Sequence, residues 1–503
     1  MPKALLVYPE YPVTFWSFKY ALKFIHRKAA FPPLGLLTIA ALLPDDWKTE
    51  LVDLNVRKLT DKQLQSADFV LISAMNVQRQ SALQVIDRCM QYSKKIIGGG
   101  PLFTEEYSEF EQVDYLVLNE AEITLPIFLD DLQKGNPKHV YSTEKFADLS
   151  LSPIPKWSLI NMHNYATMNL QYSRGCPYNC EFCDITRLFG HKVRTKSRDQ
   201  LIAELDALHS NGWHDDIFMV DDNFIGNKAK LKQEILPSMQ WWQSKFRTPH
   251  TFNTQVSIDL ADDPDLMSMM SLAGFTKVFI GIETPNAESL TECNKTKNVN
   301  RDLLGSIGTL QRAGFEVAGG FIVGFDHDPD SIFDTQARFI QRSGVVTAMV
   351  GLLNALPGTK LFRRLHLENR ILKRSTGDNM DFSMNFIPKI TAQKLISGYQ
   401  DLLQTLYSPK VYYARVKTFL RVFRKVKRKS RPLSLNDLYA FVKSAIRIGL
   451  FSRSGVQYWK LIIWTLVHRP RLLTSSVTFS IYGYHFRKTL RLNIKALSSV
   501  ELD

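Results

Sequence analysis

Three of the five cysteines of this 503-residue chain lie in one short stretch, YSRGCPYNCEFCD at residues 172–184. Cys176, Cys180 and Cys183 are spaced as C-x3-C-x2-C. So few cysteines argue against a disulfide framework and indicate a reducing compartment, where closely spaced thiols usually bind metal. The spacing therefore predicts a metal centre in this loop.

The number of available ligands distinguishes two kinds of metal centre. A zinc site takes four ligands, typically as two close pairs. The nearest further candidates are His163 and His191, and neither forms such a pair. Three thiolates without an evident fourth ligand suit an iron–sulfur cluster, whose open iron could bind a small molecule and pass it an electron. Zinc is the alternative.

The composition is that of a globular protein of two or three domains, with 45% apolar and 22% charged residues. The N-terminal sequence MPKALLVYPEYP has no long apolar run after a basic start. No stretch of about 18 uncharged apolar residues follows elsewhere in the sequence. We therefore expect a cytoplasmic chain with neither a secretory signal nor a spanning helix.

The elements that would position the cysteine loop begin with residues 1–145. Five short, apolar, β-branched runs alternate there with helical patterns, which predicts a doubly wound, Rossmann-like parallel sheet. Ligands bind such sheets at the carboxyl ends of the strands. The residues expected there are Asp53, Ser73, Gly98, Gly99, Gly100 and Glu120. The triple glycine would let a ligand approach the backbone, although a plain tight turn explains it equally well.

A second series of strand and helix patterns occupies residues 160–365. Six strand-like segments alternate with helical ones, several of which end near a glycine. Polar groups follow two of these segments: Asp221-Asp222-Asn223 come after the second, and Glu283 ends the fourth. The order of elements thus predicts a second parallel α/β domain that carries the cysteine loop.

The stretch CPYNCEFC resembles the C-x3-C-x-aromatic-C signature of the radical S-adenosylmethionine superfamily, with Phe182 as the aromatic residue. The resemblance implies that Cys176, Cys180 and Cys183 hold a [4Fe–4S] cluster. It implies that S-adenosylmethionine binds the open iron and is cleaved to a 5′-deoxyadenosyl radical. It also implies that residues 160–365 form a partial (β/α)6 barrel, with the active site at the carboxyl ends of its strands.

Further site residues follow from the same resemblance. Asp222 and Asn223 stand where members of the superfamily bind the amino group of S-adenosylmethionine, and Glu283 stands where they contact its ribose or methionine part. Gly320 and Gly324 belong to GGFIVGF, which stands beside the adenine. The alternative for the two neighbouring aspartates is that they merely cap the next helix.

A doubly wound domain ahead of a radical barrel resembles the cobalamin-binding subclass of the superfamily. The N-terminal stretch PVTFWSFKYALKFIHRKAAFPPLGLLTIAALLP, the stretch RGCPYNCEFCDITRLFGHKVRTKS and the basic C-terminal extension resemble the hopanoid C-2 methylase group. This resemblance implies that cobalamin binds beside the glycine loop, Ser73 and Glu120. The better-known cobalamin motif D-x-H-x-x-G is absent from the sequence, so no histidine of that motif can ligate cobalt.

The resemblance implies a reaction in which the deoxyadenosyl radical takes hydrogen from an unactivated carbon and methylcobalamin supplies the methyl group. It favours a small-molecule, lipid-like substrate of the hopanoid or terpenoid type, and an external electron donor such as flavodoxin or ferredoxin. The alternative is oxidation, cyclisation or rearrangement with the same cofactors and without methyl transfer.

Residues 366–503 are the third predicted unit, mainly helical and strongly basic. From Tyr407 to Asp503 there are 20 Lys/Arg and 3 Asp/Glu, in a chain whose net charge is +14. The segment 408–432 interleaves apolar and basic residues at helical spacing, and residues 456–473 contain an apolar run too short to span a bilayer. Together they predict peripheral contact with an anionic membrane. Packing on the barrel is the alternative. Nucleic acid is the least favoured partner, because related tRNA-modifying enzymes carry three N-terminal cysteines and this chain has only Cys89 there.

Overall fold

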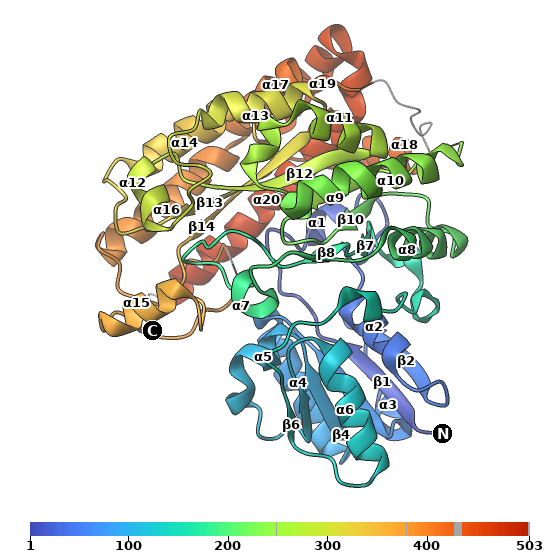
Figure 1. Cartoon of the computed structure of the whole chain (residues 1–503). Helices are drawn as coiled ribbons and strands as arrows, with labels where there is room; N and C mark the ends of the chain where they lie inside the picture. Colours follow the sequence, from blue (N-terminus) through green and yellow to red (C-terminus); the bar gives the residue numbers. More distant parts are fainter. Residues whose placement is uncertain (248, 379, 427–434, 501–503) are drawn as a thin grey trace.

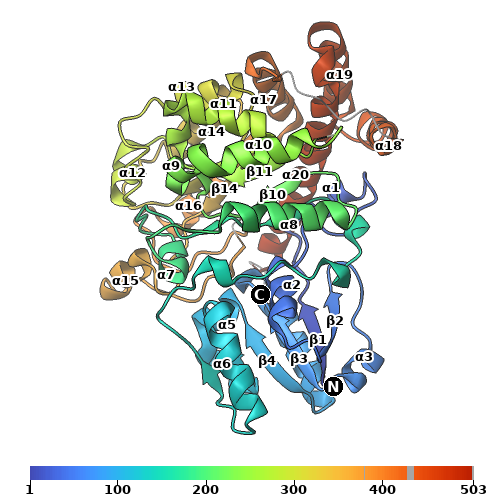
Figure 2. The ribbon, with the colours of Figure 1, turned by 45° about the vertical axis from the view of Figure 1, so that its right-hand side comes forward.

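The computed structural model describes residues 1–247, 249–378, 380–426 and 435–500. Two parallel six-stranded sheets follow one another along the chain, and a group of helices ends it. In Figure 1 the N-terminal sheet lies below the second sheet, and the C-terminal helices lie on the far side of that second sheet. Turning the molecule keeps this order of parts (Figure 2).

The N-terminal sheet has the strand order β2-β1-β3-β4-β5-β6, and all neighbouring strands are parallel. The order reverses between β1 and β3, which is the switch point of a doubly wound fold and confirms the predicted class. The strands are β1 (Lys3–Tyr8), β2 (Lys48–Asp53), β3 (Phe69–Ser73), β4 (Lys95–Gly99), β5 (Tyr115–Val117) and the short β6 (Val140–Tyr141), which the sequence pattern did not predict. The helices are α1 (Lys19–Leu22), α2 (Leu34–Leu42), α3 (Asp61–Ser66), α4 (Arg79–Gln91), α5 (Pro101–Glu106) and α6 (Ala121–Gln133).

The second sheet is an open, parallel arrangement in the order β7-β10-β11-β12-β13-β14, as expected of a partial (β/α)6 barrel. Its strands are β7 (Met168–Leu170), β10 (Ile217–Met219), β11 (Phe252–Gln255), β12 (Phe275–Glu283), β13 (Glu316–Val323) and β14 (Ala348–Leu352). Its helices include α7 (Ile185–Phe189), α8 (Arg198–Ser210), α9 (Lys228–Lys230), α10 (Leu236–Ser244), α11 (Pro264–Ala273), α12 (Ala287–Glu292), α13 (Leu303–Arg312), α14 (Ile332–Ser343) and α15 (Lys360–Leu367). A two-stranded hairpin, β8 (Ser173–Arg174) with β9 (Arg194–Thr195), flanks the cysteine loop.

The C-terminal part is helical, as predicted. Its helices are α16 (Ala392–Tyr407), α17 (Pro409–Val422), α18 (Leu435–Ser444), a π-helix (Ala445–Leu450), α19 (Gly455–His468) and α20 (Leu473–Val500). None of the helices within the described residues combines the length and hydrophobicity of a membrane span.

The helix expected to contact a membrane, within segment 408–432, packs differently from that prediction. The apolar face of α17 is buried, including Tyr412, Val416 and Phe419, and α17 contacts α13, α14 and α20. Residues 427–432 lie outside the described residues. Within the described part of this segment, the packing alternative is therefore the one that the structure supports.

Candidate active site

One cavity of about 1880 Å³ begins where the carboxyl ends of the two sheets meet and continues through the barrel to the starts of its strands, where Asp216, Lys277 and Thr347 line it. It is lined by all three clustered cysteines, by Phe182, and by Met75 and Asn76, which follow β3. Alternate residues of the barrel strands also face it, because side chains of a strand point to opposite faces in turn. The cavity exceeds the roughly 300–1,000 Å³ of a pocket for one ligand. It therefore has room for more than one large molecule.

The cysteine loop is held by close backbone contacts. Gly175 has φ of +95°, and a Cβ atom there would come within 2.8 Å of the Lys192 carbonyl oxygen, so only glycine fits before Cys176. The Cys176 N–H donates to the carbonyl of Gly190 at 3.2 Å. The folded loop thus presents its three thiols to the cavity.

The donor set of this loop fits an iron–sulfur cluster better than a single zinc ion. Cys176, Cys180 and Cys183 are free and partly buried. Burial raises the pKa of each thiol, so ionised thiolates require a cationic partner. Among the described residues, the group that brings three ligand atoms within 4.8 Å of one another consists of histidines elsewhere in the barrel, not of these cysteines. Such a spread of thiols suits the corners of a cluster.

Glu283 and Lys295 form an ion pair inside the cavity. Lys295 Nζ lies 2.7 Å from Glu283 Oε1, and both side chains are largely buried. Burial lowers the pKa of Lys295, but Glu283 and the nearby Cys180 and Cys183 outweigh it and raise that pKa. Lys295 was not predicted as a site residue, because nothing in the sequence ECNKTKN distinguishes it from Lys297. Lys295 thus places its positive charge near the thiols of Cys180 and Cys183.

Glu283 also has an unusual backbone. Its φ is +64°, a conformation that is rare for a residue with a side chain. Gln336 Nε2 donates to the carbonyl oxygen of Glu283 at 3.0 Å and helps to hold this conformation. The turn directs the carboxylate toward Lys295 at the end of β12.

The aspartate pair after β10 divides between two roles. Asp221 is fully buried and accepts hydrogen bonds from Tyr172 N–H and from the N–H and hydroxyl of Ser173, so it fixes the entry to the hairpin. Asp222 lines the cavity and accepts from Gly175 N–H at 3.0 Å, and burial raises its pKa to about 6.

The following residue, Asn223, also lines the cavity and exchanges hydrogen bonds with Ser257. Asn223 stands at the N-cap of the helix that follows, and that helix has no side-chain cap. The alternative in which the two aspartates cap this helix is therefore wrong.

The two glycines expected beside the adenine lie in different places. Gly320 lines the cavity, where β13 pairs it with Gly281 of β12, so two neighbouring strands leave space at the same level. Gly324 is not among the residues lining the cavity. Its N–H donates to Asp328 at 2.8 Å, and its α-carbon faces Leu395 of α16. The structure thus gives Gly324 a role in a turn and in helix packing.

Two acidic residues of the N-terminal sheet also lie outside the cavity lining, contrary to expectation. Glu120 accepts hydrogen bonds of 2.6 and 2.8 Å from Arg194 of β9. Asp53 accepts a hydrogen bond of 2.9 Å from the Tyr165 hydroxyl, in the segment leading into the barrel. Both carboxylates are therefore used to join the N-terminal domain to the barrel, because each meets a donor from the other part of the chain.

The glycine loop stays close to the cavity without being part of its lining. Gly100 has φ of +86°, and a Cβ atom there would lie 2.6 Å from Ser73 Oγ. A Cβ atom at Gly98 would lie 2.9 Å from Phe103, so that glycine allows α5 to pack on β4. Gly99 faces the Val117 carbonyl of β5. Pro101, the next residue, lines the cavity.

The cavity wall beside this loop has unpaired polar groups that fit a large polar ligand such as a corrin. Asn76 Oδ1 is buried and has no hydrogen-bond partner among the described residues. The same is true of Asn354 Oδ1, which follows β14 and lines the barrel side of the cavity. Buried polar atoms normally have partners, so a bound molecule is expected to supply them.

Three families match successive parts of the chain. Residues 24–129 match the B12 binding domain, residues 170–340 match the radical SAM superfamily, and residues 359–498 match a domain of unknown function. The first two families imply cobalamin, S-adenosylmethionine and a [4Fe–4S] cluster as cofactors.

Full-length relatives agree with this domain order. The chain is 38% identical to an uncharacterised methyltransferase of Synechocystis sp., over 96% of this chain and 91% of the relative. It is 32% identical to the hopanoid C-2 methylase of Rhodopseudomonas palustris, over 82% and 78% of the two chains. Its fold is similar to that of the cobalamin-dependent S-adenosylmethionine radical enzyme OxsB, with a TM-score of 0.63 and 16% identity over 99% of this chain and 81% of OxsB.

Proposed function

Since this chain belongs to the family of cobalamin-dependent radical S-adenosylmethionine methyltransferases that includes the hopanoid C-2 methylase, we propose that it methylates an unactivated carbon of a lipid-like substrate of the hopanoid or terpenoid type. The observation that carries the proposal is the shape and lining of the cavity. It continues from the cysteines along the inner face of the barrel to the C-terminal helices.

Apolar side chains make up most of the cavity wall away from the cysteines, and a few charged ones, among them Arg27, Asp216 and Lys277, also reach it. The apolar residues include Leu22, Ile25, Phe31, Val256, Phe279, Phe321, Met349, Phe441, Val477 and Ile481. Apolar surface excludes water and favours a hydrocarbon substrate over a charged one. A polycyclic hydrocarbon could lie along this wall and bring one carbon to the cysteine end.

The cavity also reaches the outer surface at α18. Leu438 lines the cavity and is 58% exposed, so its side chain contacts both the cavity and the solvent. It is one of the exposed apolar side chains that recur about once per turn along α18, the π-helix and α19. We call this set the exposed apolar stripe; it consists of Leu435, Leu438, Val442, Ile446, Leu450, Phe451, Val456, Trp459, Ile463, Leu466 and Val467. Exposed basic side chains accompany it, namely Arg447, Arg453, Lys460 and Arg471. An apolar face flanked by cations suits an anionic membrane surface.

We therefore assign the proposed membrane contact to the exposed apolar stripe and not to α17, whose apolar face is buried. A substrate dissolved in the bilayer could then enter beside Leu438 without crossing water. In Figure 2, α18 and α19 stand out from the rest of the molecule, on the side away from the N-terminal sheet. Peripheral docking thus gives the apolar cavity a source of apolar substrate.

The cavity residues have distinct proposed roles around the cofactors. Cys176, Cys180 and Cys183 would hold the cluster, and Asp222, Asn223 and Glu283 would orient S-adenosylmethionine beside it. Phe182 packs near Phe325 and shields the cluster loop from water. The bound cofactors supply radical generation and the methyl group, with an external donor such as flavodoxin or ferredoxin providing electrons. The protein positions these groups and excludes water.

The experiment is an anaerobic reaction of the cluster-loaded, cobalamin-loaded protein with S-adenosylmethionine carrying a deuterated methyl group. Hopanoids in anionic liposomes are the substrate, and products are identified by mass spectrometry. A product that gains the labelled methyl group supports the proposal. Loss of hydrogen without a methyl group would overturn it in favour of the oxidative alternative. Methylation of water-soluble compounds alone would overturn the lipid assignment.

A matched pair of variants tests the entry route. Leu438→Glu places a charge where the cavity meets the surface, whereas Leu272→Glu places one on a 62% exposed side chain of α11 that neither lines the cavity nor belongs to the exposed apolar stripe. We expect only Leu438→Glu to reduce methylation, while formation of 5′-deoxyadenosine continues in both. Equal losses in the two variants would contradict entry beside Leu438.

A further inference from the structure

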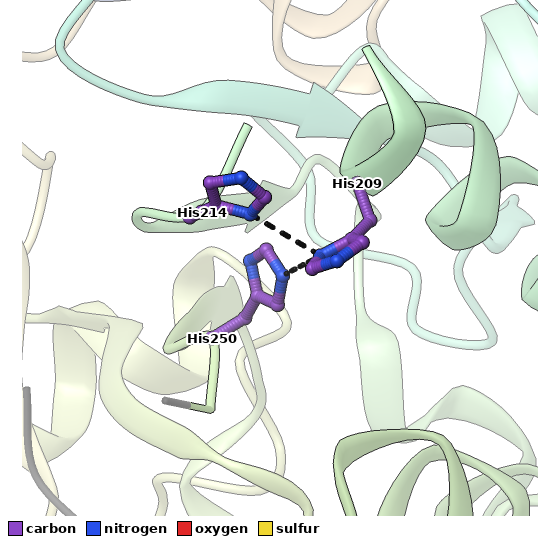
Figure 3. Close-up of side chains that lie close together, drawn as sticks. All are labelled: His209, His214 and His250. Atoms are coloured by element: carbon purple, nitrogen blue, oxygen red, sulfur yellow. Dashed lines mark hydrogen bonds between the residues drawn. The ribbon is translucent and has the colours of Figure 1, made fainter. Parts of the chain in front are cut away.

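Three imidazoles converge at the amino-terminal ends of the barrel strands, opposite the cysteines (Figure 3). His209 lies in the last turn of α8, His214 precedes β10, and His250 precedes β11. His209 Nδ1 is 3.1 Å from His250 Nε2 and 3.3 Å from His214 Nδ1, and one nitrogen of each ring lies within 4.8 Å of the others. We propose that these three histidines bind one zinc ion that stabilises the barrel, independently of the methyl-transfer site.

Hydrogen bonding among the rings cannot satisfy all three nitrogens. His250 Nδ1 lies 3.2 Å from the carbonyl oxygen of Asp215, which only accepts, so the His250 proton is on Nδ1 and Nε2 is a bare acceptor. If His209 Nδ1 carries a proton and donates it to His250 Nε2, this nitrogen has no lone pair with which to accept a hydrogen bond from His214 Nδ1. A metal ion removes the conflict, because it accepts a lone pair from each ring at once.

Two of the three nitrogen–nitrogen distances match those of a tetrahedral zinc site, and the third is within 4.8 Å. Zinc–nitrogen bonds of about 2.0–2.1 Å place neighbouring ligand nitrogens about 3.3 Å apart. The two short nitrogen–nitrogen distances here are 3.1 and 3.3 Å. The hydrogen bond from His250 Nδ1 to the Asp215 carbonyl is also the contact that a zinc-bound histidine usually makes with its other nitrogen.

The surroundings hold the rings in place. His209 stacks on Phe246 with ring centroids 4.0 Å apart, and Trp242 lies 5.0 Å from His250 by the same measure. Trp242 in turn donates to Asp206 of α8 at 2.7 Å. His250 is buried, whereas His214 is exposed, so water can occupy the fourth position.

A metal at this point would tie the end of α8 to the starts of β10 and β11. These residues lie at the amino-terminal end of the strands, where side chains of such barrels usually contribute to stability. Catalysis takes place at the carboxyl-terminal end. The expected consequence is a more stable barrel and no direct part in the reaction.

The test uses cluster-loaded protein under anaerobic conditions, so that the three loop cysteines are already occupied. Zinc chloride is added, excess is removed by gel filtration, and zinc per chain is measured by mass spectrometry together with the melting temperature. We expect one additional zinc per chain and a higher melting temperature in the wild type. His214→Ala and His209→Gln should each weaken zinc binding by at least about tenfold, because each removes one of three ligands.

His366→Ala is the matched control, since that exposed histidine is on α15 and outside the group. His214 is exposed, so its replacement should not disturb the core; iron content and circular dichroism check this. Equal zinc retention by wild type and both variants would overturn the proposal. So would failure of the wild type to retain zinc or to gain stability from it.

Discussion

Arg194 donates hydrogen bonds of 2.6 and 2.8 Å to the two carboxylate oxygens of Glu120, and so joins the hairpin beside the cysteine loop to the N-terminal domain. Arg174 pairs in the same way with Glu122, at 2.8 and 3.1 Å. Both carboxylates are almost completely buried. These pairs fix the position of the N-terminal domain against the hairpin that flanks the cysteine loop.

Glu120→Ala should destabilise the protein, because it leaves the Arg194 guanidinium buried without its partner. Removing one member of a buried ion pair costs about 3–5 kcal/mol. Urea unfolding followed by tryptophan fluorescence measures the change. Glu111→Ala, at an exposed glutamate of the same domain, should change the unfolding free energy little. Similar stability of the two variants would show that the Glu120 pair does not hold the domains together.

The Glu122 pair should make stability depend on pH. Burial raises the pKa of Glu122, but the hydrogen bonds and charge of Arg174 outweigh burial and bring the pKa from 4.5 to about 2. A lowered pKa in the folded state stabilises the protein above pH 4.5, and the contribution disappears as pH falls toward 2. The shift corresponds to about 3 kcal/mol.

Unfolding free energies measured between pH 7 and pH 3 test this dependence. Glu122→Gln should be less stable than the wild type at pH 7, and the difference should shrink as pH falls. Glu111→Gln serves as the control for a surface carboxylate. A constant difference between Glu122→Gln and the wild type over this range would contradict the assignment.

Replacing Cys176, Cys180 or Cys183 by Ala should abolish both cluster assembly and cleavage of S-adenosylmethionine, because each supplies one of three thiolates. Iron analysis and chromatographic detection of 5′-deoxyadenosine after reconstitution are the measurements. Cys293→Ser is the control and should keep both iron and cleavage activity. The control is a demanding one, because Cys293 is buried beside the cysteine loop and its backbone carbonyl oxygen accepts a hydrogen bond from Glu181 N–H. Full iron content in the triple alanine variant would refute the assignment.

Lys295→Met should make the cluster harder to reduce. The variant removes a positive charge beside the thiols and leaves the Glu283 carboxylate uncompensated, and both changes favour the oxidised cluster. Redox titration monitored by electron paramagnetic resonance should therefore give a more negative midpoint potential. Lys295→Arg keeps the positive charge and should give a midpoint potential close to that of the wild type. Lys297→Met changes an exposed lysine two residues away and should have little effect; an equal shift there would contradict a specific role for Lys295.

The double variant Phe451→Asp with Ile463→Asp should release the protein from anionic liposomes in a low-salt sedimentation assay. Both side chains lie on the exposed apolar stripe, and charge there opposes insertion among lipids. Leu367→Asp is matched to Phe451 in exposure, 83% against 82%, but lies on α15. If Leu367→Asp also released the protein, docking would not be specific to the stripe. If the wild type bound neutral liposomes equally well, docking would not be electrostatic.

Features that depend on local spacing could be predicted from the order of amino acids. The cysteine spacing indicated the metal centre and its superfamily, since the ligands of this loop are close neighbours in the chain. Periodicity predicted both parallel sheets, because buried strands are short apolar runs wherever they occur. It also placed Asp222, Asn223 and Glu283 at strand ends, where the cavity lies.

Contacts between side chains that are distant in the chain could not be predicted in this way, because they form only when the chain folds. Glu120 was predicted at a strand end, but its partner Arg194 is 74 residues further along the chain. Lys295 became a site residue only when folding brought it to Glu283. Segment 408–432 and α19 both have apolar residues at helical spacing, yet α17 buries its apolar face and α19 leaves Val456, Ile463 and Val467 exposed. Helical periodicity specifies that a helix has an apolar face, whereas packing against the other elements decides whether that face meets the core or the solvent.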